Sequence, residues 1–327
     1  MARDLPFSGP ESGCRVVHAD WPAMTRAIAF IFNAHAGGGS GRVWLETNRQ
    51  AVEAIAAGGP ITIVESGARI QAAVDLALAR RCDAVVAGGG DGTLNAVASK
   101  LVGLPTAFGV LPLGTLNHFA KDAGLALDPL AALRSIAAGH TKQLDVGEVN
   151  GLFFLNNSSI GLYVDVVRDR ECQQTRLGRG KWPAFAWAIL GALRRYPFLT
   201  VALIMDGHAL SHRTPFVFVG NNAYRTEGLQ IGQRDGLRGG ALSVYIVDRA
   251  GRWRLLALGL RALVGQLRQA RDFKAFRTAE LRIDTGHRRL RVAMDGEVRQ
   301  LDAPLQYRIH PGALRVIVPE SQPEDAT

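Results

Sequence analysis

The stretch DAVVAGGGDGTLNAV, residues 83–97, decides the fold of the first half of the chain. Four apolar residues lead into a run of glycines, and Asp91 and Thr93 then open a helical pattern. This order is typical of a strand, a tight turn and a helix. Glycine lets the backbone approach a ligand closely, and a helix start offers free N–H groups and a positive dipole end to an anion. The stretch therefore predicts an anion-binding turn, with a plain turn capped by Asp91 as the simpler alternative.

Asp91 is an unusual residue for such a turn, because its carboxylate would repel a bare phosphate group. Two interpretations follow. Either a metal ion lies between the acid and the phosphate, or the acid accepts a proton from an incoming hydroxyl group. Asp91 is therefore a candidate metal ligand and a candidate catalytic residue.

Short apolar segments alternate with helical patterns up to about residue 140. We expect strands at residues 27–32, 61–64, 84–87 and 106–111, and helices at 42–57, 70–80, 93–101 and 129–138. Strands that are apolar throughout are typical of a parallel sheet that helices cover on both faces. Polar or glycine-rich loops follow three of these strands, at residues 33–41, 88–93 and 112–117. Because ligands bind at the carboxyl ends of such strands, we expect the three loops to meet at one edge of the sheet.

The pattern changes near residue 143 to short strands with partial alternation. Strands at 143–149 and 152–158 are joined by Asn150-Gly151, which favours a hairpin. We expect further strands at 199–205, 216–220, 242–247, 281–283, 290–294, 305–309 and 314–318, and helices at 182–195 and 251–272. This half predicts a mainly antiparallel β domain. The expected division is an α/β domain at 25–143, a β-rich domain at 144–318, and irregular ends at 1–24 and 319–327.

The composition is that of a globular protein with a basic surface. Hydrophobic residues make up 47% of the chain, charged residues 20%, and the net charge is +9. No apolar run approaches the roughly 20 residues that span a bilayer, and the first 20 residues lack the apolar core of a secretory signal. Cys14, Cys82 and Cys172 show no metal or redox spacing, so we expect reduced thiols in a cytosolic protein.

The basic charge is compatible with nucleic acid, anionic lipid or phosphorylated substrates as partners. The sequence shows no helix-turn-helix, zinc-finger or aromatic-basic pattern, so we expect no nucleic-acid partner. The expected helix at 251–272 carries a leucine stripe and an arginine face, formed by Leu256, Leu260, Leu263 and Leu267 and by Arg254, Arg261 and Arg268. Packing on the sheet with a solvated basic face is the simpler interpretation. Peripheral contact with an anionic membrane surface is a compatible alternative.

Together, the loops resemble the diacylglycerol kinase catalytic-domain family, which includes soluble bacterial lipid kinases and the sphingosine and ceramide kinases. The matching segments are Asn33 with Gly37, Gly-Gly-Asp-Gly-Thr at 89–93, Pro-Leu-Gly-Thr-Leu-Asn at 112–117 and Asp295-Gly-Glu297. The second segment is shared with NAD kinases and phosphofructokinases, whereas the third looks specific to the lipid-kinase branch. The resemblance implies an N-terminal doubly wound, mainly parallel sheet domain that holds ATP and a C-terminal β-sandwich domain that helps to hold the acceptor. The active site would lie between the two domains.

The resemblance also implies roles for these residues. Phosphoryl transfer depends on positioning and charge neutralisation more than on covalent help. We expect ATP and Mg²⁺ as cofactors, with Asp91 near the metal, Glu297 as the general base, and Asp295 orienting Glu297 or sharing the metal. Whether Asp91 or Glu297 takes the proton stays open. The candidate nucleotide-binding residues are Asn33, Gly37, Gly88, Gly89, Gly90, Gly92, Thr93, Gly114, Thr115 and Asn117.

Three positions depart from the family pattern. His118 stands where the family commonly has an aspartate after loop three, and Arg238 stands where a late segment tied to a structural metal has one. The sequence therefore leaves open whether a structural metal site survives. Loop one has Ala34 where the family commonly has proline. It also has no obvious lysine, and Arg42 or His35 is a candidate to replace one.

The sequence thus predicts an ATP-dependent kinase that phosphorylates a hydroxyl of diacylglycerol, a sphingoid base or a related lipid at the membrane surface. A NAD-kinase-like small-molecule kinase is the second candidate. An inactive nucleotide- and lipid-binding sensor is the third, which His118 and Arg238 favour and the retained acids disfavour. We expect a cytoplasmic protein. Peripheral contact with the inner face of the membrane, the acceptor lipid and a homodimer stay open.

Overall fold

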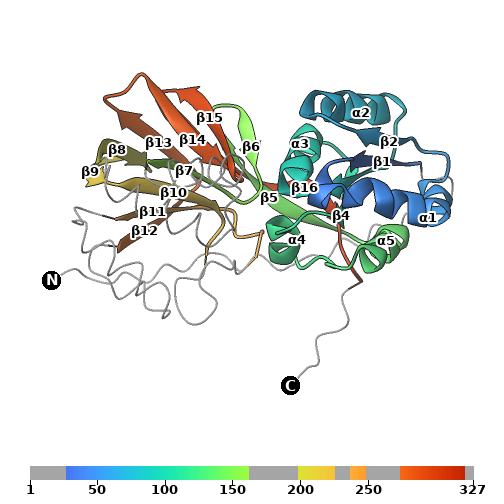
Figure 1. Cartoon of the computed structure of the whole chain (residues 1–327). Coiled ribbons are helices and arrows are strands. Elements are labelled where there is room, and N and C mark those ends of the chain that lie inside the picture. The colour runs from blue at the N-terminus through green and yellow to red at the C-terminus, as the bar shows by residue number, and fades with distance from the viewer. Residues whose placement is uncertain (1–26, 162–197, 225–235, 248–272, 321–327) are drawn as a thin grey trace.

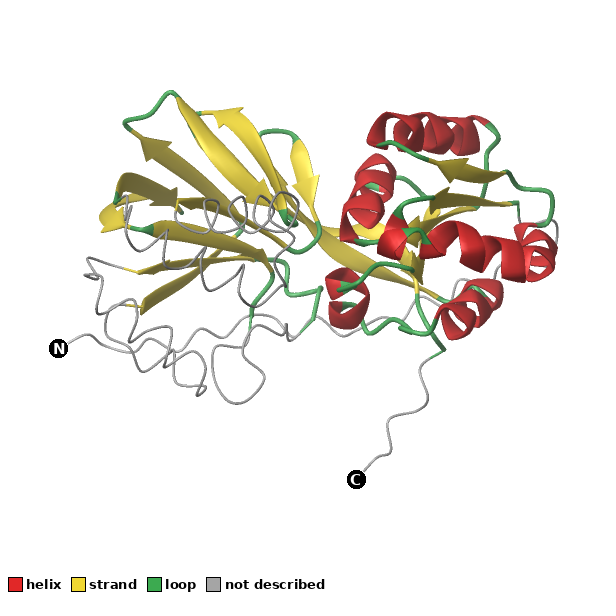
Figure 2. Cartoon of the chain, in the orientation of Figure 1, coloured by secondary structure: helices red, strands yellow, loops and turns green. Residues whose placement is uncertain are grey.

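The computed structural model describes residues 27–161, 198–224, 236–247 and 273–320. In Figure 1 the described chain forms two units side by side, which two long strands connect. Figure 2 shows that the described helices belong to one unit, whereas the other is built from strands. The helices expected at 182–195 and 251–272, together with Cys14 and Cys172, lie outside the described residues.

The N-terminal unit is a parallel sheet covered by helices on both faces. Its strands lie in the order β2-β1-β3-β4: β1 (Ile28–Asn33), β2 (Ile61–Val64), β3 (Ala84–Gly89) and β4 (Ala107–Pro112). Its helices are η1 (Ala36–Gly38), α1 (Ser40–Ala56), α2 (Gly67–Ala79), α3 (Asp91–Leu101), α4 (His118–Asp122) and α5 (Pro129–Ala138).

Both faces of this sheet are buried because successive side chains of a strand point to opposite sides. In β1, Phe30 and Phe32 pack in a core with side chains of α1 and α5. Ile31, between them, packs in a second core with side chains of α2, α3 and α4. This arrangement explains the continuously apolar strands and confirms the expected doubly wound sheet.

Strands β5 (Thr141–Val149) and β16 (Leu305–Ile317) run from one unit into the other. They pair antiparallel along their length, and the end of β16 pairs in parallel with β4, Val316 opposite Phe108. The late segment therefore packs back onto the first unit. The two strands expected at 305–309 and 314–318 are one strand, with an irregular register between His310 and Leu314.

The C-terminal unit is a sandwich of two antiparallel layers. One layer continues the first sheet with β6 (Leu152–Phe154), β8 (Leu199–Met205), β9 (His208–Thr214) and β13 (Glu280–Thr285). The other contains, in spatial order, β12 (Phe273–Thr278), β11 (Leu242–Val247), β10 (Phe216–Asn221), β7 (Asn157–Gly161), β14 (Arg289–Met294) and β15 (Glu297–Asp302). Side chains from both layers, such as Val201 and Val292, form one core. This confirms the expected β-sandwich domain.

Several strands differ from expectation for identifiable reasons. The strand expected at 152–158 is two strands, β6 and β7, which belong to different sheets. β9 and β15 were not expected, because most of their side chains are exposed and show no apolar alternation. Their turns, Asp206-Gly207 and Asp295-Gly296, have positive φ at both residues, which is the geometry of tight hairpins.

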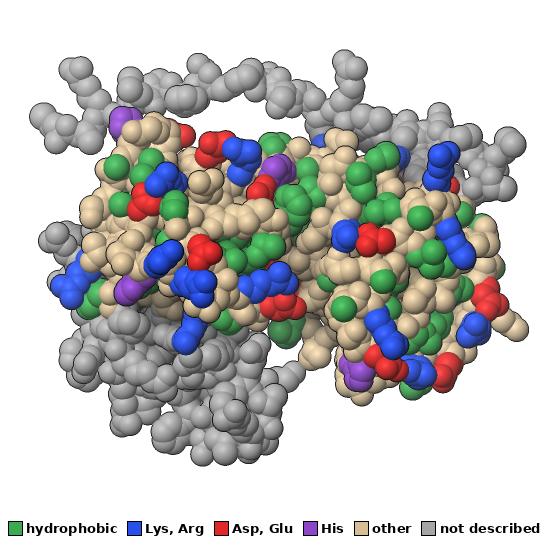
Figure 3. Space-filling view, turned by 90° about the horizontal axis from the view of Figure 1, so that it is seen from above, with side chains coloured by type: hydrophobic (Ala, Val, Ile, Leu, Met, Phe, Trp, Pro, Cys, Tyr) green, Lys and Arg blue, Asp and Glu red, His purple; other side chains and the backbone are tan. Residues whose placement is uncertain are grey.

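The distribution of surface charge and the length and polarity of the helices indicate which partners the protein could contact. On the face shown in Figure 3, acidic and basic side chains are intermixed over the described residues, so the excess positive charge does not gather there in one patch. Within the described ranges, no helix is long and apolar enough to cross a membrane.

Asp145, buried on β5, fixes the connection between the units. Its carboxylate accepts hydrogen bonds from the backbone N–H groups of Gly240 and Gly312, both at 2.8 Å. Its own N–H donates to the carbonyl oxygen of Leu237 at 2.8 Å. β5 thereby contacts both β16 and the segment before β11. The domain boundary near residue 143 stays a prediction, since β5 crosses it.

We expect Asp145→Asn to lower the free energy of unfolding by about 1–3 kcal/mol, because the amide nitrogen would face a backbone N–H donor. Chemical denaturation measures this change. The matched control is Asp302→Asn, whose side chain is 77% exposed and pairs with Arg289. The control should change stability by less than about 0.5 kcal/mol. Equal effects of the two substitutions would contradict the role of Asp145.

Candidate active site

A cavity of about 810 Å³ lies where the two units meet. Its walls come from η1, the starts of α2 and α3 and the loop after β4 on one side, and from the β5–β6 and β14–β15 hairpins on the other. Ten of the thirteen predicted site residues line it: Asn33, Gly37, Gly90, Asp91, Gly92, Thr93, Gly114, Thr115, Asp295 and Glu297. The fold thus brings together three loops and a turn that lies about 200 residues further along the chain.

The three loops contact one another through short polar and glycine residues. Asn33, at the end of β1, donates a hydrogen bond from Nδ2 to Thr93 Oγ1 at 2.9 Å, which joins loop one to loop two. The Cα atoms of Gly90 and Gly114 lie so close that a Cβ on Gly114 would overlap Gly90. Gly37 has a φ of 56°, in the left-handed region that favours glycine. Glycine is therefore required both for the loop conformation and for the contact between loops.

Three predicted nucleotide-binding residues, Gly88, Gly89 and Asn117, do not line the cavity. A Cβ on Gly88 would lie 2.5 Å from the Phe32 ring, and one on Gly89 would lie 2.7 Å from the Thr93 side chain. Asn117 donates to the carbonyl oxygen of Gly114 at 3.0 Å. These residues shape the loops from behind and hold loop three in place.

Asp91, the first residue of α3, connects loops two and three. Its carboxylate accepts hydrogen bonds from the backbone N–H groups of Phe119 at 3.1 Å and His118 at 3.2 Å. His118 contributes its backbone to this contact, and its side chain is exposed. Each carboxylate oxygen retains a lone pair that can bind a further partner. Asp91 therefore positions loop three while still lining the cavity.

Asp295 is the most heavily hydrogen-bonded acid of the site. Its carboxylate accepts from the backbone N–H groups of Leu155, Asn156 and Asn157 at 2.8, 2.7 and 3.1 Å, and from the side-chain amide of Asn95. Burial raises the pKa of Asp295, and these hydrogen bonds act in the opposite direction. The carboxylate has no hydrogen bond to Glu297 among the described residues. Its contacts favour a positioning role.

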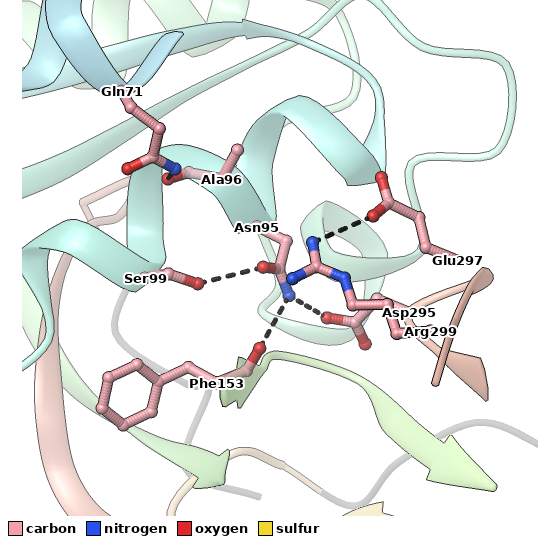
Figure 4. Close-up of polar contacts among 8 residues, drawn as sticks. All are labelled: Gln71, Asn95, Ala96, Ser99, Phe153, Asp295, Glu297 and Arg299. Carbon is pink, nitrogen blue, oxygen red and sulfur yellow. Dashed lines mark hydrogen bonds and ion pairs between the residues drawn. The ribbon is translucent and has the colours of Figure 1, made fainter. Parts of the chain in front are cut away.

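Asn95, on α3, joins the two units at this point. Besides Asp295, its Nδ2 contacts the carbonyl oxygen of Phe153 on β6 at 3.3 Å, and its Oδ1 accepts from Ser99 Oγ at 3.0 Å. Figure 4 shows these side chains converging between the helix and the β14–β15 hairpin. The contacts tie the helix that follows the glycine loop to the hairpin that carries Glu297.

Glu297 lies against the start of α3. Its Oε1 is 3.1 Å from the position that a Cβ on Gly92 would occupy, so a larger residue at 92 would crowd it. Its Oε2 accepts a hydrogen bond from Arg299 Nη2 at 3.2 Å (Figure 4). Glu297 is 57% exposed and therefore accessible from the cavity.

Five polar residues that line the cavity were not predicted from the sequence: Gln71, Asn95, Ser99, Lys100 and Arg299. Asn95 follows Asp91 by four residues, which places both on the same face of a helix. Arg299 follows Glu297 by two residues, which places both on the same face of a strand. The two-residue spacing would have indicated that Arg299 lies beside Glu297 only if residues 297–302 had been predicted to form a strand.

The described residues contain no group of three or more His, Cys, Asp or Glu side chains that could hold a metal ion. Mg²⁺ is commonly held by one or two carboxylates, several waters and substrate phosphates instead of a protein cage. Asp91, which lines the cavity, therefore fits a Mg²⁺ ion that arrives with a nucleotide. Arg42, a candidate cation of loop one, pairs with Glu65 at 3.4 Å.

We expect Asp295→Asn to lower the free energy of unfolding by about 1–3 kcal/mol, because an amide nitrogen would face N–H donors that now share a carboxylate. Thermal unfolding monitored by circular dichroism measures the change. Asp284→Asn is the control, since its carboxylate lies on β13 and contacts the exposed Arg282. An Asp295→Asn protein as stable as this control would contradict the assigned contacts.

Known protein families match both halves of the chain. The model of the diacylglycerol kinase catalytic domain matches residues 27–149, and that of the YegS C-terminal NAD kinase beta sandwich-like domain matches residues 158–318. A Pseudomonas fluorescens protein described as "probable lipid kinase YegS-like" is 30% identical over 286 residues, covering 85% of this chain and 92% of its own. A Bacillus subtilis diacylglycerol kinase is 35% identical over 134 residues, covering 39% of this chain and 44% of its own.

The fold is also found among solved structures. A crystal structure of a diacylglycerol kinase from Bacillus anthracis superposes with a TM-score of 0.66 at 19% identity. The match covers 91% of this chain and 98% of that one. The family models, the relatives and the shared fold lead to one conclusion: the chain belongs to the diacylglycerol kinase catalytic-domain family.

Proposed function

We propose that the protein is an ATP-dependent lipid kinase that transfers the γ-phosphate of ATP to a hydroxyl group of diacylglycerol or a related lipid. One observation carries the proposal. The cavity brings the glycine loops of the first unit against Glu297 of the second, at the start of α3. Anion-binding backbone thus lies beside a carboxylate that is accessible to an incoming hydroxyl.

The nucleotide phosphates are assigned to the loops of the first unit. The free N–H groups and positive dipole end of α3 attract phosphate, and the glycines allow close approach. Thr93 and Thr115 supply hydroxyl groups, and Gly37 adds backbone from loop one. Asn33 holds Thr93 in place through its hydrogen bond. This assignment uses the cavity-lining members of the predicted set and leaves Gly88, Gly89 and Asn117 with a supporting role.

Mg²⁺, when bound with ATP, supplies positive charge that offsets the charge of the phosphates. Asp91 is the carboxylate assigned to it. Asp91 also accepts hydrogen bonds from the backbone of α4, so it holds loop three at a set distance from the glycine loop.

Glu297 is the proposed general base. It would accept the proton of the lipid hydroxyl as the hydroxyl oxygen attacks the γ-phosphorus and ADP leaves. Asp295 supports this step by holding the β14–β15 turn in place through its buried hydrogen bonds. Asp91 is assigned to metal binding and loop positioning: both its oxygens accept backbone hydrogen bonds, and each keeps a lone pair for a metal ion.

The choice of a lipid acceptor rests on the family and on the names of its relatives. A membrane-embedded substrate requires the cleft to reach the bilayer surface, so we propose peripheral contact with the inner face of the membrane. The departures His118 and Arg238 do not support an inactive sensor. Neither side chain lines the cavity, and the cavity retains Asp91, Asp295 and Glu297.

We expect Glu297→Gln to reduce kcat by about 100-fold or more, in the range of general-base effects, while the affinity for ATP changes little. Steady-state assays with labelled ATP and lipid vesicles measure both quantities. Glu280→Gln is the matched control, because Glu280 is an exposed glutamate on β13 that pairs with Arg308. An unchanged kcat in Glu297→Gln would contradict the base assignment.

We expect wild-type protein to transfer labelled phosphate to a lipid in a panel of diacylglycerol, sphingosine and ceramide presented in vesicles. NAD is included in the same assay as the competing acceptor. Transfer to NAD alone would contradict the lipid-kinase proposal. ATP binding without transfer to any acceptor would support the sensor instead.

A further inference from the structure

Among the described residues, two basic side chains line the cavity, Lys100 and Arg299. Lys100 lies in the last turn of α3 and pairs with Asp75 at 2.9 Å. It follows Asp91 by nine positions, which corresponds to roughly 13 Å along the helix axis. Arg299 is therefore the described cavity cation nearest to the start of α3, where the phosphates are assigned.

The position of Arg299 follows from its contact with Glu297. Both residues lie on the same face of β15, two positions apart. The guanidinium donates to Glu297 Oε2 at 3.2 Å, while Glu297 Oε1 lies beside Gly92 in the first turn of α3. Figure 4 shows the Arg299 side chain reaching from the hairpin to the Glu297 carboxylate. One carboxylate thus separates Arg299 from the phosphate-binding turn.

Arg299 can leave Glu297 and bind a phosphate group at little cost in stability. Their side chains are 50% and 57% exposed, and ion pairs at such exposure contribute little to stability. A guanidinium carries five N–H donors in a planar fork that matches phosphate oxygens. A terminal phosphate carries more negative charge than a carboxylate, so it competes well for the same donors.

We propose that Arg299 binds the phosphoryl group that is transferred, exchanging Glu297 for the γ-phosphate when ATP enters the cavity. The proposal rests on the proposed function. The exchange has two consequences. It places a positive charge on the transferred group, and it frees the Glu297 carboxylate to accept the hydroxyl proton.

The step balances without a further reactant. The lipid hydroxyl oxygen forms a bond to the γ-phosphorus, and the bond from that phosphorus to the oxygen bridging to the β-phosphate breaks. ADP leaves with the electron pair of the broken bond. The hydroxyl proton passes to Glu297, and Arg299 offsets charge on the oxygens of the group in transfer.

The test compares ATP and ADP, which differ only in the phosphate assigned to Arg299. Calorimetry on the full chain in the presence of Mg²⁺ gives both dissociation constants. In Arg299→Gln we expect the affinity for ATP to fall by about 10-fold or more, the range for hydrogen bonds to charged groups, and that for ADP to change less than about 2-fold. Arg299→Lys keeps the charge but loses the fork, so it should recover part of the ATP affinity.

The matched control is Arg289→Gln on the neighbouring strand β14, because Arg289 is also exposed and pairs with an acid, Asp302. It should leave both affinities unchanged. Equal changes for ATP and ADP in Arg299→Gln, or none, would overturn the proposal. Arg299→Gln could instead shift the pH profile of kcat/KM while the ratio of the dissociation constants for ATP and ADP stays at its wild-type value. That result would also overturn the proposal, because Arg299 would then act only through Glu297. If wild-type protein binds neither ATP nor ADP, both this proposal and the proposed function are overturned. If wild-type protein binds both and Arg299→Gln keeps the wild-type ratio of the two dissociation constants, only the role of Arg299 is overturned.

Discussion

The carboxylate of Asp295 is the contact on which the geometry of the site depends. It collects three backbone N–H groups from the connection between β6 and β7 and the amide of Asn95 from α3. At this point an apparently continuous strand divides, and its two halves enter different sheets. Asp295 is also the first residue of the Asp295-Gly296 turn, and this turn places Glu297 beside the start of α3. A buried acid is normally unfavourable, and burial raises the pKa of Asp295, while four N–H donors act in the opposite direction.

Asp145 has a comparable role in the linking strands, where it accepts two backbone N–H groups at 2.8 Å. Asp91 repeats the pattern at α4. In each case a carboxylate holds backbone from another segment, and this contact fixes loop positions more firmly than exposed ion pairs can. Phosphoryl transfer depends on such positioning, because the protein contributes little covalent chemistry. The glycines complete the arrangement by letting neighbouring loops approach to backbone contact.

The sequence was sufficient to predict the doubly wound sheet, since strands buried on both faces must be apolar throughout. It also predicted that three loops would meet at one edge, because parallel strands end on the same side. The division of the 152–158 strand was not predictable, since it depends on an acid about 140 residues later. β15 was missed because an exposed edge strand has no apolar alternation, and Arg299 was missed with it. Motif matching also does not separate residues that line the cavity from residues that pack beside it: Gly88 lies against Phe32, Asn117 donates to Gly114, and neither lines the cavity. The catalytic roles themselves stay predictions.

In the proposed mechanism, the cavity between the units holds the terminal phosphate of ATP between the start of α3 and the β15 side chains. A crystal structure of the full chain with Mg²⁺ and a non-hydrolysable ATP analogue tests it most directly. The predicted result is a γ-phosphate that contacts the backbone of residues 90–93 and lies within hydrogen-bond reach of Arg299, with Glu297 released from its present partner. A nucleotide bound outside this cavity, or one whose terminal phosphate points away from β15, would contradict the account.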